Sequence, residues 1–418
     1  MFDLSKALSS KSPSTTVTKT GNSNGIASAA LYYQSQECFD LVTEVFRFEG
    51  WDEPDALRRS VKDSKINPKQ VQQIVILELT ESHNVVEEAR EFASKVPTHK
   101  GVVVIGKEDA ISTLRALKDM GFYYVFWPVN KQEFADFLMH VNRNLQTFSG
   151  VSEKRKAKRV GMVGVKGGVG TSFISAELCS YLAGQQTDTI LVDHQYNNTN
   201  LDILFAIREF QPRSVDEFTA PLHEMDESGA LSYIYEVRKN LRLLAISGDM
   251  PAENIFNYNQ TLCELLSRNT NFIVEDFSGS VDFKVEAQML VDTFDVLVVV
   301  FEPSVSSIRS ARKLRERIES IQLTLSKKTR LLLVANYHRP PTSFVIKSDE
   351  MKKYLGAEVD LEFAYSKNLA HIVIDGKQAH KHDRAIATSV DKLARLINGN
   401  SIEESKLPKW FGLGKKKK

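Results

Sequence analysis

Cysteine is scarce in this sequence. Among 418 residues only Cys38, Cys179 and Cys263 are cysteines, and they lie far apart. Cysteine-bound zinc sites and disulfide frameworks need closely spaced or paired cysteines, so the sequence excludes both. Such sparse use of cysteine is typical of a reducing compartment, and we expect a cytoplasmic protein.

Long apolar runs and a large net charge are also missing. No run approaches the roughly 18 apolar residues that cross a bilayer, and the first residues lack the apolar block of a secretory signal. We therefore expect no membrane-spanning helix. The 54 Lys and Arg residues balance 53 Asp and Glu residues, for a formal charge of +1. Such a chain has no global positive field, and we expect no nucleic-acid partner.

Length and changes in composition divide the chain into five segments. A chain of 418 residues exceeds one ordinary domain of about 100–200 residues. The predicted segments are a flexible leader at 1–27, an α/β domain at 28–148, a basic linker at 149–159, a second α/β domain at 160–400 and a basic aromatic tail at 401–418. We interpret the linker as a solvated connection, with a specific anion site as the alternative.

Strand and helix patterns alternate in both predicted domains. Short apolar runs are each followed by apolar residues at helical spacing. The predicted strands are 29–33, 73–79, 101–105 and 123–127 in the first domain, and 160–165, 189–193, 241–247, 271–276, 295–301 and 330–336 in the second. This alternation requires a parallel sheet covered by helices on both faces, so we predict two doubly wound α/β domains in tandem.

A glycine-rich turn follows the predicted strand at 160–165. Gly167, Gly168 and Gly170 allow backbone conformations in which successive amide groups converge on an anion at the start of a helix. Ser172 lies in the first helical turn, where a hydroxyl can ligate Mg²⁺ beside phosphates. We predict a phosphate-binding loop, with a simple tight turn as the alternative.

The turn departs from the pattern G-x-x-x-x-G-K-[ST] at two positions. Val165 stands at the first glycine position, and Thr171 stands at the lysine position. Thr171 offers no ammonium, although one unit charge at 4 Å is worth about 4 kcal/mol at an effective dielectric constant of 20. We expect Lys166, at the start of the turn, to supply this charge.

The run KGGVGTS resembles the deviant Walker A loop of the MinD/ParA ATPases. Lys166 matches the lysine that reaches across a dimer to the partner's nucleotide in that family. A receiver-like domain before such a loop resembles the TadZ/CpaE branch, which serves pilus assembly and tolerates loss of the second lysine. The resemblance implies a P-loop NTPase fold, ATP and Mg²⁺ as cofactors, and a binding loop made by Lys166, Gly167, Gly168, Val169, Gly170, Thr171 and Ser172.

Later strand ends resemble further parts of the family site. By this resemblance Asp193 holds Mg²⁺ through water, Asp276 is the Walker B acid, and Asn336 contacts adenine. Gln195 stands where relatives carry an aspartate that orients water, and a neutral amide is a poorer base. We therefore predict Lys166, Asp193 and Gln195 as catalytic residues of weak or absent hydrolysis, and Ser172, Asp193 and Asp276 as metal ligands. A helix cap or an ion-pair partner is the alternative role for Asp276.

The first domain resembles a CheY-like receiver that lacks phosphorylation chemistry. Glu78 stands near the phosphoacceptor position, residues 34–36 replace the acidic pair, and Trp127-Pro128 replaces Lys-Pro. We expect an interaction module, because phosphoryl transfer has no visible machinery. We expect Glu78 to be a partly solvated strand-end carboxylate, with a mimic of the phosphorylated form as the alternative. We expect most of the aromatic residues at 122–127 to fill the core.

The resemblance implies an ATP-binding localisation and assembly factor for a Tad/Flp-type pilus or secretion apparatus. We expect a homodimeric scaffold at the cell pole or the inner face of the membrane, with secretion ATPases or membrane platform proteins as partners. The tail, with Trp410 and Lys415–Lys418, suits a peripheral membrane contact or serves as a solubilising end. A DNA-binding ParA-type segregation ATPase and an atypical response regulator are the alternative functions.

Overall fold

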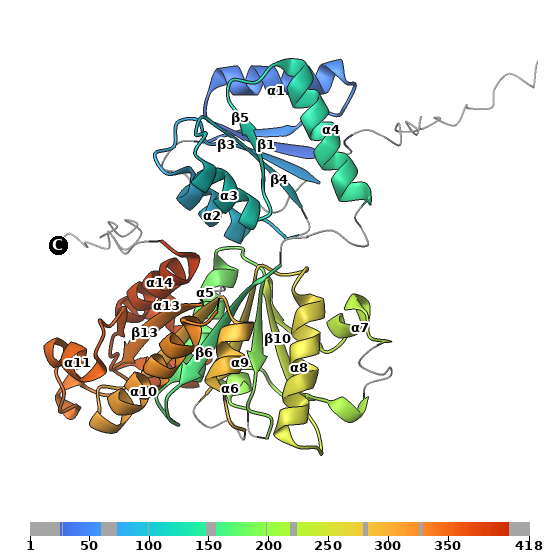
Figure 1. Cartoon of the computed structure of the whole chain (residues 1–418). Helices are drawn as coiled ribbons and strands as arrows, with labels where there is room; N and C mark the ends of the chain where they lie inside the picture. The colour runs from blue at the N-terminus through green and yellow to red at the C-terminus, as the bar shows by residue number, and fades with distance from the viewer. Residues whose placement is uncertain are drawn as a thin grey trace, which may run out of the picture.

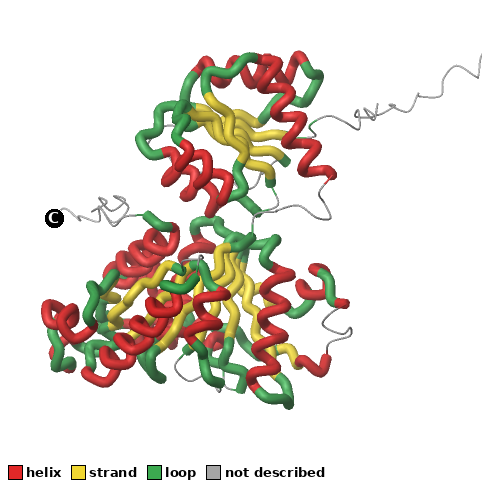
Figure 2. The backbone as a smooth tube through the Cα atoms, viewed as in Figure 1, coloured by secondary structure: helices red, strands yellow, loops and turns green. Residues whose placement is uncertain are grey.

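Two α/β units follow one another along the chain, each with a sheet between helices (Figures 1 and 2). The computed structural model describes residues 26, 28–59, 73–98, 100–147, 156–197, 199–217, 224–278, 283–325 and 329–400. The predicted tail and almost all of the predicted leader lie outside the described residues. Within the described part, no helix combines the length and the apolar character that a membrane span requires.

The first unit is a five-stranded parallel sheet in the order β2-β1-β3-β4-β5. Its strands are β1 (Ala29–Tyr33), β2 (Asp55–Arg58), β3 (Ile74–Glu78), β4 (Gly101–Gly106) and β5 (Tyr123–Phe126). Its helices are α1 (Gln36–Phe48), α2 (Val85–Lys95), α3 (Ile111–Asp119) and α4 (Lys131–Thr147). Helices α1 and α4 contact each other, as do α2 and α3, and two separate apolar clusters fill the two faces of the sheet. This strand order is that of flavodoxin and CheY.

The second unit is a nine-stranded sheet in the order β14-β13-β12-β6-β11-β7-β10-β8, with β9 antiparallel to β10. Its main strands are β6 (Lys158–Gly164), β7 (Thr189–Asp193), β10 (Leu241–Ser247), β11 (Phe272–Phe277), β12 (Val296–Phe301) and β13 (Arg330–Asn336). The minor strands are β8 (Arg213–Ser214), β9 (Ile234–Arg238) and β14 (Leu361–Phe363). The prediction of parallel α/β units is confirmed. Because β6 lies between β11 and β12, the strand order reverses beside it, which is where such sheets bind ligands.

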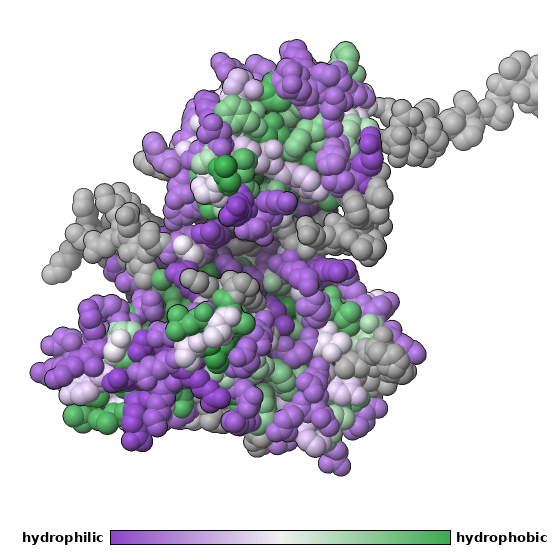
Figure 3. Space-filling model, viewed as in Figure 1, coloured by the Kyte–Doolittle hydropathy of each residue, from purple (hydrophilic) through white to green (hydrophobic). Residues whose placement is uncertain are grey.

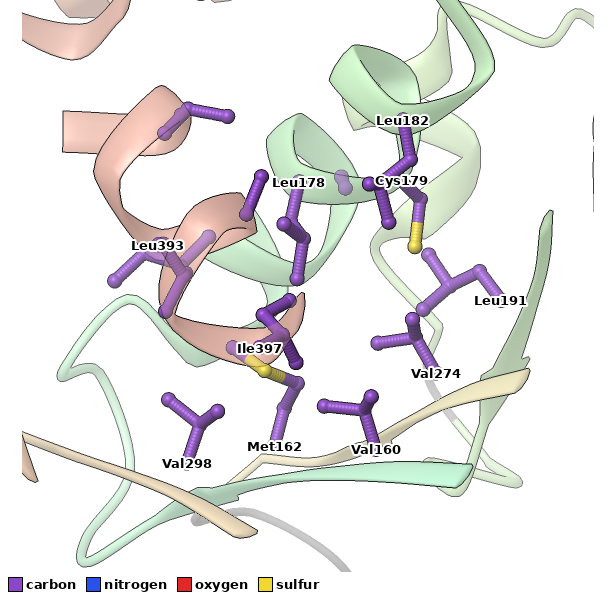
Figure 4. Close-up of a cluster of buried hydrophobic side chains, with 14 of the residues drawn as sticks. Val160, Met162, Leu178, Cys179, Leu182, Leu191, Val274, Val298, Leu393 and Ile397 are labelled. Atoms are coloured by element: carbon purple, nitrogen blue, oxygen red, sulfur yellow. The ribbon is translucent and has the colours of Figure 1, made fainter. Parts of the chain in front are cut away.

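Helices cover both faces of this sheet. On one face, α5 (Thr171–Gly184) and α14 (Arg384–Asn398) pack over the sheet through side chains such as Leu178 and Leu393 (Figure 4). On the other face lie α8 (Ala252–Leu266), α9 (Ala287–Thr293) and α10 (Val305–Gln322). Shorter helices are α6 (Leu201–Phe205), α7 (Glu227–Leu231), α11 (Ser348–Leu355), α12 (Leu369–Ile374) and α13 (Ala379–His382), with 3₁₀ turns at Val215–Glu217 and Pro341–Ser343.

The two units meet through hydrogen bonds donated by side chains of both units. The Nδ2 of Asn271 donates to the carbonyl oxygen of Val96 at 2.7 Å, and Thr98 Oγ1 donates to the carbonyl oxygen of Arg268. Val96 and Thr98 follow α2, whereas Arg268 and Asn271 precede β11. The end of α2 therefore sits against the amino-terminal edge of the large sheet.

Candidate functional site

A left-handed loop connects β6 to α5 at the carboxyl edge of the large sheet. Gly168 and Gly170 have φ values of +79° and +89°, a region that favours glycine. Gly167 and Gly168 are exposed, so their backbone is open to a ligand, and Gly170 is the N-cap of α5. The first amide groups of a helix lack partners within the helix and carry partial positive charge. The loop therefore has the conformation and the position that an anion site requires.

Asn336 closes the loop from the end of β13. Its Nδ2 donates to the carbonyl oxygen of Val169 at 2.8 Å, and the side chain is buried. A Cβ on Gly170 would stand 2.4 Å from this same nitrogen, so only glycine fits there. The structure thus places the Asn336 amide on the backbone of the loop. The contact of Asn336 with adenine stays a prediction.

Two carboxylates stand side by side below the loop. Asp193 ends β7, and Asp276 pairs with it in register on the neighbouring strand β11. Both are buried. Burial, and next the charge of Asp193, raise the pKa of Asp276 to about 7. Burial likewise raises the pKa of Asp193. Two neighbouring carboxylates with little water between them favour a cation that neutralises them.

Hydroxyl groups from the first turns of α5 face these carboxylates. Ser175 Oγ donates to Asp276 Oδ1 at 3.0 Å, and Ser172 also hydrogen-bonds Asp276 and so opposes the rise in its pKa. Thr171 is buried, and its Oγ1 has no partner among the described residues. Oxygen ligands of this kind suit Mg²⁺. The described residues contain no cluster of three or more His, Cys, Asp or Glu side chains placed to hold a metal.

Asp193 is fixed by the segment that follows it. The backbone N–H of Gln195 donates to Asp193 Oδ1 at 2.9 Å, and Thr199 Oγ1 donates to Oδ2. Gln195 is half-buried, and its contact with Asp193 is made by its backbone. Asp202, at the start of α6, has a buried Oδ1 without a partner among the described residues. The structure therefore brings Asp193 and the backbone of Gln195 together beside the loop.

Lys166 is bound to an acid within its own chain. Its Nζ lies 2.5 Å from Oε1 of Glu302, which follows β12 and is buried. Ser304 Oγ donates to the same carboxylate at 2.9 Å, and His338 Nε2 lies 3.4 Å from its other oxygen. Burial raises the pKa of Glu302, but the hydrogen bonds from Lys166 and Ser304 outweigh it and lower the pKa. The sequence analysis missed Glu302, although its place at a strand end could have revealed it.

A second buried cluster lies on the other side of β11. Glu275 Oε1 accepts from Arg159 Nε at 3.0 Å, and Glu275 Oε2 lies 2.9 Å from His194 Nε2. The His194 ring stacks on Phe277 at 4.3 Å, and its Nδ1 lies 2.8 Å from the hydroxyl of Tyr196. Sequence reasoning did not identify His194. Because these partners occupy Glu275, Asp276 is the acid of β11 that faces the loop.

In the first unit Glu78 is buried, so the expectation of a partly solvated carboxylate is wrong. Its oxygens accept from the backbone N–H of Gln34 at 2.6 Å, from that of Ser35 at 2.9 Å, and from the hydroxyls of Ser35 and Thr80, each at 2.6 Å. Ser35 is the N-cap of α1, where a negative charge is stabilised. Glu78 therefore ties β3 to the start of α1.

The aromatic segment at the end of the first sheet divides between core and surface. Phe122 and Trp127 are buried, and Tyr123 and Tyr124 are half-buried, as expected of core residues. Phe126 is 50% exposed.

A known protein family matches the part of the chain that contains both the loop and the two carboxylates. The family described as "CobQ/CobB/MinD/ParA nucleotide binding domain" matches residues 160–378, which is 219 of the 418 residues. This range contains every site residue predicted from the sequence. No curated protein matches the chain.

Several solved structures are similar to the chain. A ParA family ATPase from Chlorobium tepidum TLS has a TM-score of 0.47 and 19% identity, over 57% of this chain and 98% of its own. The MinC:MinD cell division complex of Aquifex aeolicus gives 0.46 and 20%, over 60% and 99%. The septum site-determining protein MinD complexed with Mg-ADP from Pyrococcus horikoshii OT3 gives 0.45 and 16%, over 58% and 96%.

Proposed function

The chain belongs to the CobQ/CobB/MinD/ParA nucleotide-binding family, and from this premise we propose that its second unit binds ATP with Mg²⁺. One observation carries the proposal: two glycines with positive φ hold a loop at the start of α5, directly beside a buried pair of carboxylates. The loop offers backbone amides to phosphates, and the acids offer oxygens to a cation. Loss of either half would leave a site that no longer suits a magnesium nucleotide.

The residues around the carboxylates fit Mg²⁺. Asp193 and Asp276 supply negative charge, and the hydroxyl of Ser172 supplies a neutral oxygen beside Asp276. Burial, and next the charge of Asp193, raise the pKa of Asp276; a bound magnesium ion would neutralise the charge of Asp193 and would screen the nucleotide phosphates. Thr171 leaves the loop without a second lysine, so the cation carries more of this task. We expect hydrolysis to be weak or absent, because Gln195 offers no carboxylate to a water molecule.

Lys166 is the residue through which we propose that ATP promotes a dimer. In a single chain it is paired with Glu302, and in a face-to-face dimer it would leave this acid for the phosphates of the partner's nucleotide. The phosphates of the partner's ATP would attract Lys166 away from Glu302. ATP binding would therefore favour the dimer, and dimerisation would increase the affinity for ATP. The protein would act as a nucleotide-gated scaffold.

The resemblance to the TadZ/CpaE branch supports a proposal for the cellular role of this scaffold. We propose a localisation and assembly factor for a Tad/Flp-type pilus or secretion apparatus, at the inner face of the membrane. A five-stranded unit of flavodoxin-like order, without a free acceptor carboxylate at Glu78, precedes the nucleotide-binding unit and supports this assignment. The partners would be a secretion ATPase or a membrane platform protein, recruited through the first unit.

Calorimetry and sedimentation of the full-length protein test the proposal. We expect saturable binding of ATP with Mg²⁺, and a shift of the sedimentation coefficient from monomer to dimer. Lys166→Ala should weaken the ATP-linked shift at least tenfold in protein concentration, because the bridging ammonium is gone. Lys239→Ala is the matched control, since Lys239 lies in the β9–β10 turn, away from the loop. Absence of ATP binding, or equal dimerisation of both variants, would refute the proposal.

A further inference from the structure

We propose that the cleft between the two units binds a phosphorylated small molecule that also carries an apolar group. This site is distinct from the loop of the proposed ATP site, because it lies at the amino-terminal edge of the large sheet. The cleft has a volume of about 600 Å³, within the usual size of a ligand site. Figure 3 shows hydrophilic residues bordering the narrowing between the units.

The lining is positively charged. Four cationic side chains, Arg90, Lys118, Lys156 and Lys158, face two carboxylates, Asp119 and Asp295, for a formal charge of +2. Arg90 and Lys118 come from α2 and α3 of the first unit, whereas Lys158 starts β6 of the second. Cations from both units therefore converge on one space.

Three of these cations form no close ion pair within the described part of the chain. Among the described residues, no carboxylate lies within ion-pair distance of Arg90, Lys118 or Lys158. The Nζ of Lys158 donates one hydrogen bond, to the carbonyl oxygen of Ile397 at 3.1 Å, and an ammonium carries three donors. Burial, and next the nearby Arg90 guanidinium, lower the pKa of Lys158 to about 8. An anion in the cleft would relieve this repulsion.

Of the two acids of the lining, Asp295 offsets part of this charge, since it acts to raise the pKa of Lys158 against burial and Arg90. Asp295 Oδ2 accepts from the backbone N–H of Arg159 at 2.9 Å, so it helps to fix the start of β6. Lys156 is paired with Glu264, an exposed acid of α8. The charge that remains comes mainly from Arg90, Lys118 and Lys158.

The remainder of the lining indicates the class of ligand. Ala93 and Met120 border the cleft from the first unit, and Ala157 borders it from the second. Side chains of this kind contact a ring or a short carbon chain, while Arg and Lys bind phosphate. A cleft of about 600 Å³ suits a molecule of the size of a nucleotide and is too small for a duplex nucleic acid.

The test uses the full-length protein with its loop already saturated by ATP and Mg²⁺. Calorimetric titration with guanosine monophosphate should then give one further site per chain, and inorganic pyrophosphate should bind the same site more weakly. The double variant Arg90→Ala/Lys118→Ala should lose at least tenfold in affinity for both probes. Arg115→Ala, an exposed change on α3 outside the lining, should leave both affinities unchanged.

Hydrogen exchange provides the second readout. Bound guanosine monophosphate should slow the exchange of amides at the end of α2 and at the start of β6 together, since the ligand contacts both units. No further site under ATP saturation, equal binding by the double variant, or tighter binding of pyrophosphate than of guanosine monophosphate would overturn the inference. Because ATP binding is measured separately, failure of this site would leave the proposed ATP site standing.

Discussion

At the scale of single residues, Glu275 and Asp276 show how position on a strand decides the role of an acid. Successive side chains of β11 point to opposite faces of the sheet. Glu275 meets Arg159 and His194, whereas Asp276 meets the serines of α5 and Asp193. Two adjacent acids therefore have opposite shifts in pKa, to about 2 for Glu275 and to about 7 for Asp276.

Removal of the Glu275 carboxylate should destabilise the second unit. Glu275→Ala leaves the mostly buried guanidinium of Arg159 and the buried ring of His194 without their acid. Breaking a buried ion pair in this way costs about 3–5 kcal/mol in the free energy of unfolding. Urea unfolding measures the loss. Glu264→Ala, which removes the exposed pair with Lys156, should cost about 1 kcal/mol or less.

The stabilisation from Glu275 should also depend on pH. Burial opposes its ionisation, but Arg159 and His194 outweigh burial and lower its pKa from the ordinary 4.5 to about 2. A folded-state pKa below the unfolded value gives stability that is complete above about pH 4.5 and is lost as the pH falls toward 2. The difference between the wild type and Glu275→Ala should shrink over this window. A difference that stays constant would contradict the ion pair.

At the scale of elements, the link from β6 through the loop to α5 was predictable because its signals are local. Glycine spacing and an apolar run before a helical pattern lie within about 25 consecutive residues. The start of β6 was not predictable from these signals. Lys158 and Arg159 are basic like the residues of the predicted linker before them, yet they pair with Phe272 and Ile273 in the sheet.

Gly170→Ala should damage both the fold and the site. A side chain at φ +89° is strained, and its Cβ would stand 2.4 Å from Asn336 Nδ2, which is buried and bonded to Val169. The backbone strain and the loss of that hydrogen bond should together lower the free energy of unfolding by about 2–3 kcal/mol. ATP binding should weaken at least tenfold.

Gly184→Ala is the matched control for this change. Gly184 ends the same helix, and nothing lies within 4 Å of a Cβ added there. Alanine favours a helix over glycine by up to about 1 kcal/mol, so stability should hold or rise slightly. ATP binding should not change. A Gly170→Ala protein that matches Gly184→Ala in both measurements would show that the loop tolerates a side chain.

Some strands and contacts gave no usable signal in the sequence. Strand β2 is exposed at every residue and has no apolar pattern, and β14 has only three residues. His194 and Glu302 acquire their roles from segments far away in the chain, since His194 and Glu275 are 81 residues apart. Spacing rules describe neighbours in one element, and they do not predict such long-range pairs.

At the scale of the whole molecule, hydrogen bonds join the two units at the end of α2, and α2 also contacts α14. Asn271 is central, because its Nδ2 donates to Val96 of the first unit while its Oδ1 accepts from the backbone N–H of Asp188 in the second, at 3.3 Å. The side chain therefore couples the end of α2 to two segments at the edge of the large sheet.

Asn271→Ala should loosen this contact while both units stay folded. Each lost hydrogen bond contributes about 0.5–1.5 kcal/mol. We expect faster hydrogen exchange at the amides around Val96, measured by mass spectrometry. Asn269→Ala is the control, since Asn269 donates to Glu227 within the second unit. Equal acceleration around Val96 in both variants would show that Asn271 does not join the units.

Strand β6 connects the cleft between the units to the glycine-rich loop. β6 begins with Lys158 in the cleft and finishes at Gly164, just before the glycine-rich loop, so seven residues, roughly 20 Å, separate the two. Suppose that a ligand in the cleft moves β6 and thereby raises the affinity of the loop for ATP. Thermodynamic linkage then requires that ATP in the loop raises the affinity of the cleft for its ligand by the same factor. A metabolite sensed at the junction would then tune the affinity for ATP, and ATP would tune the sensor equally.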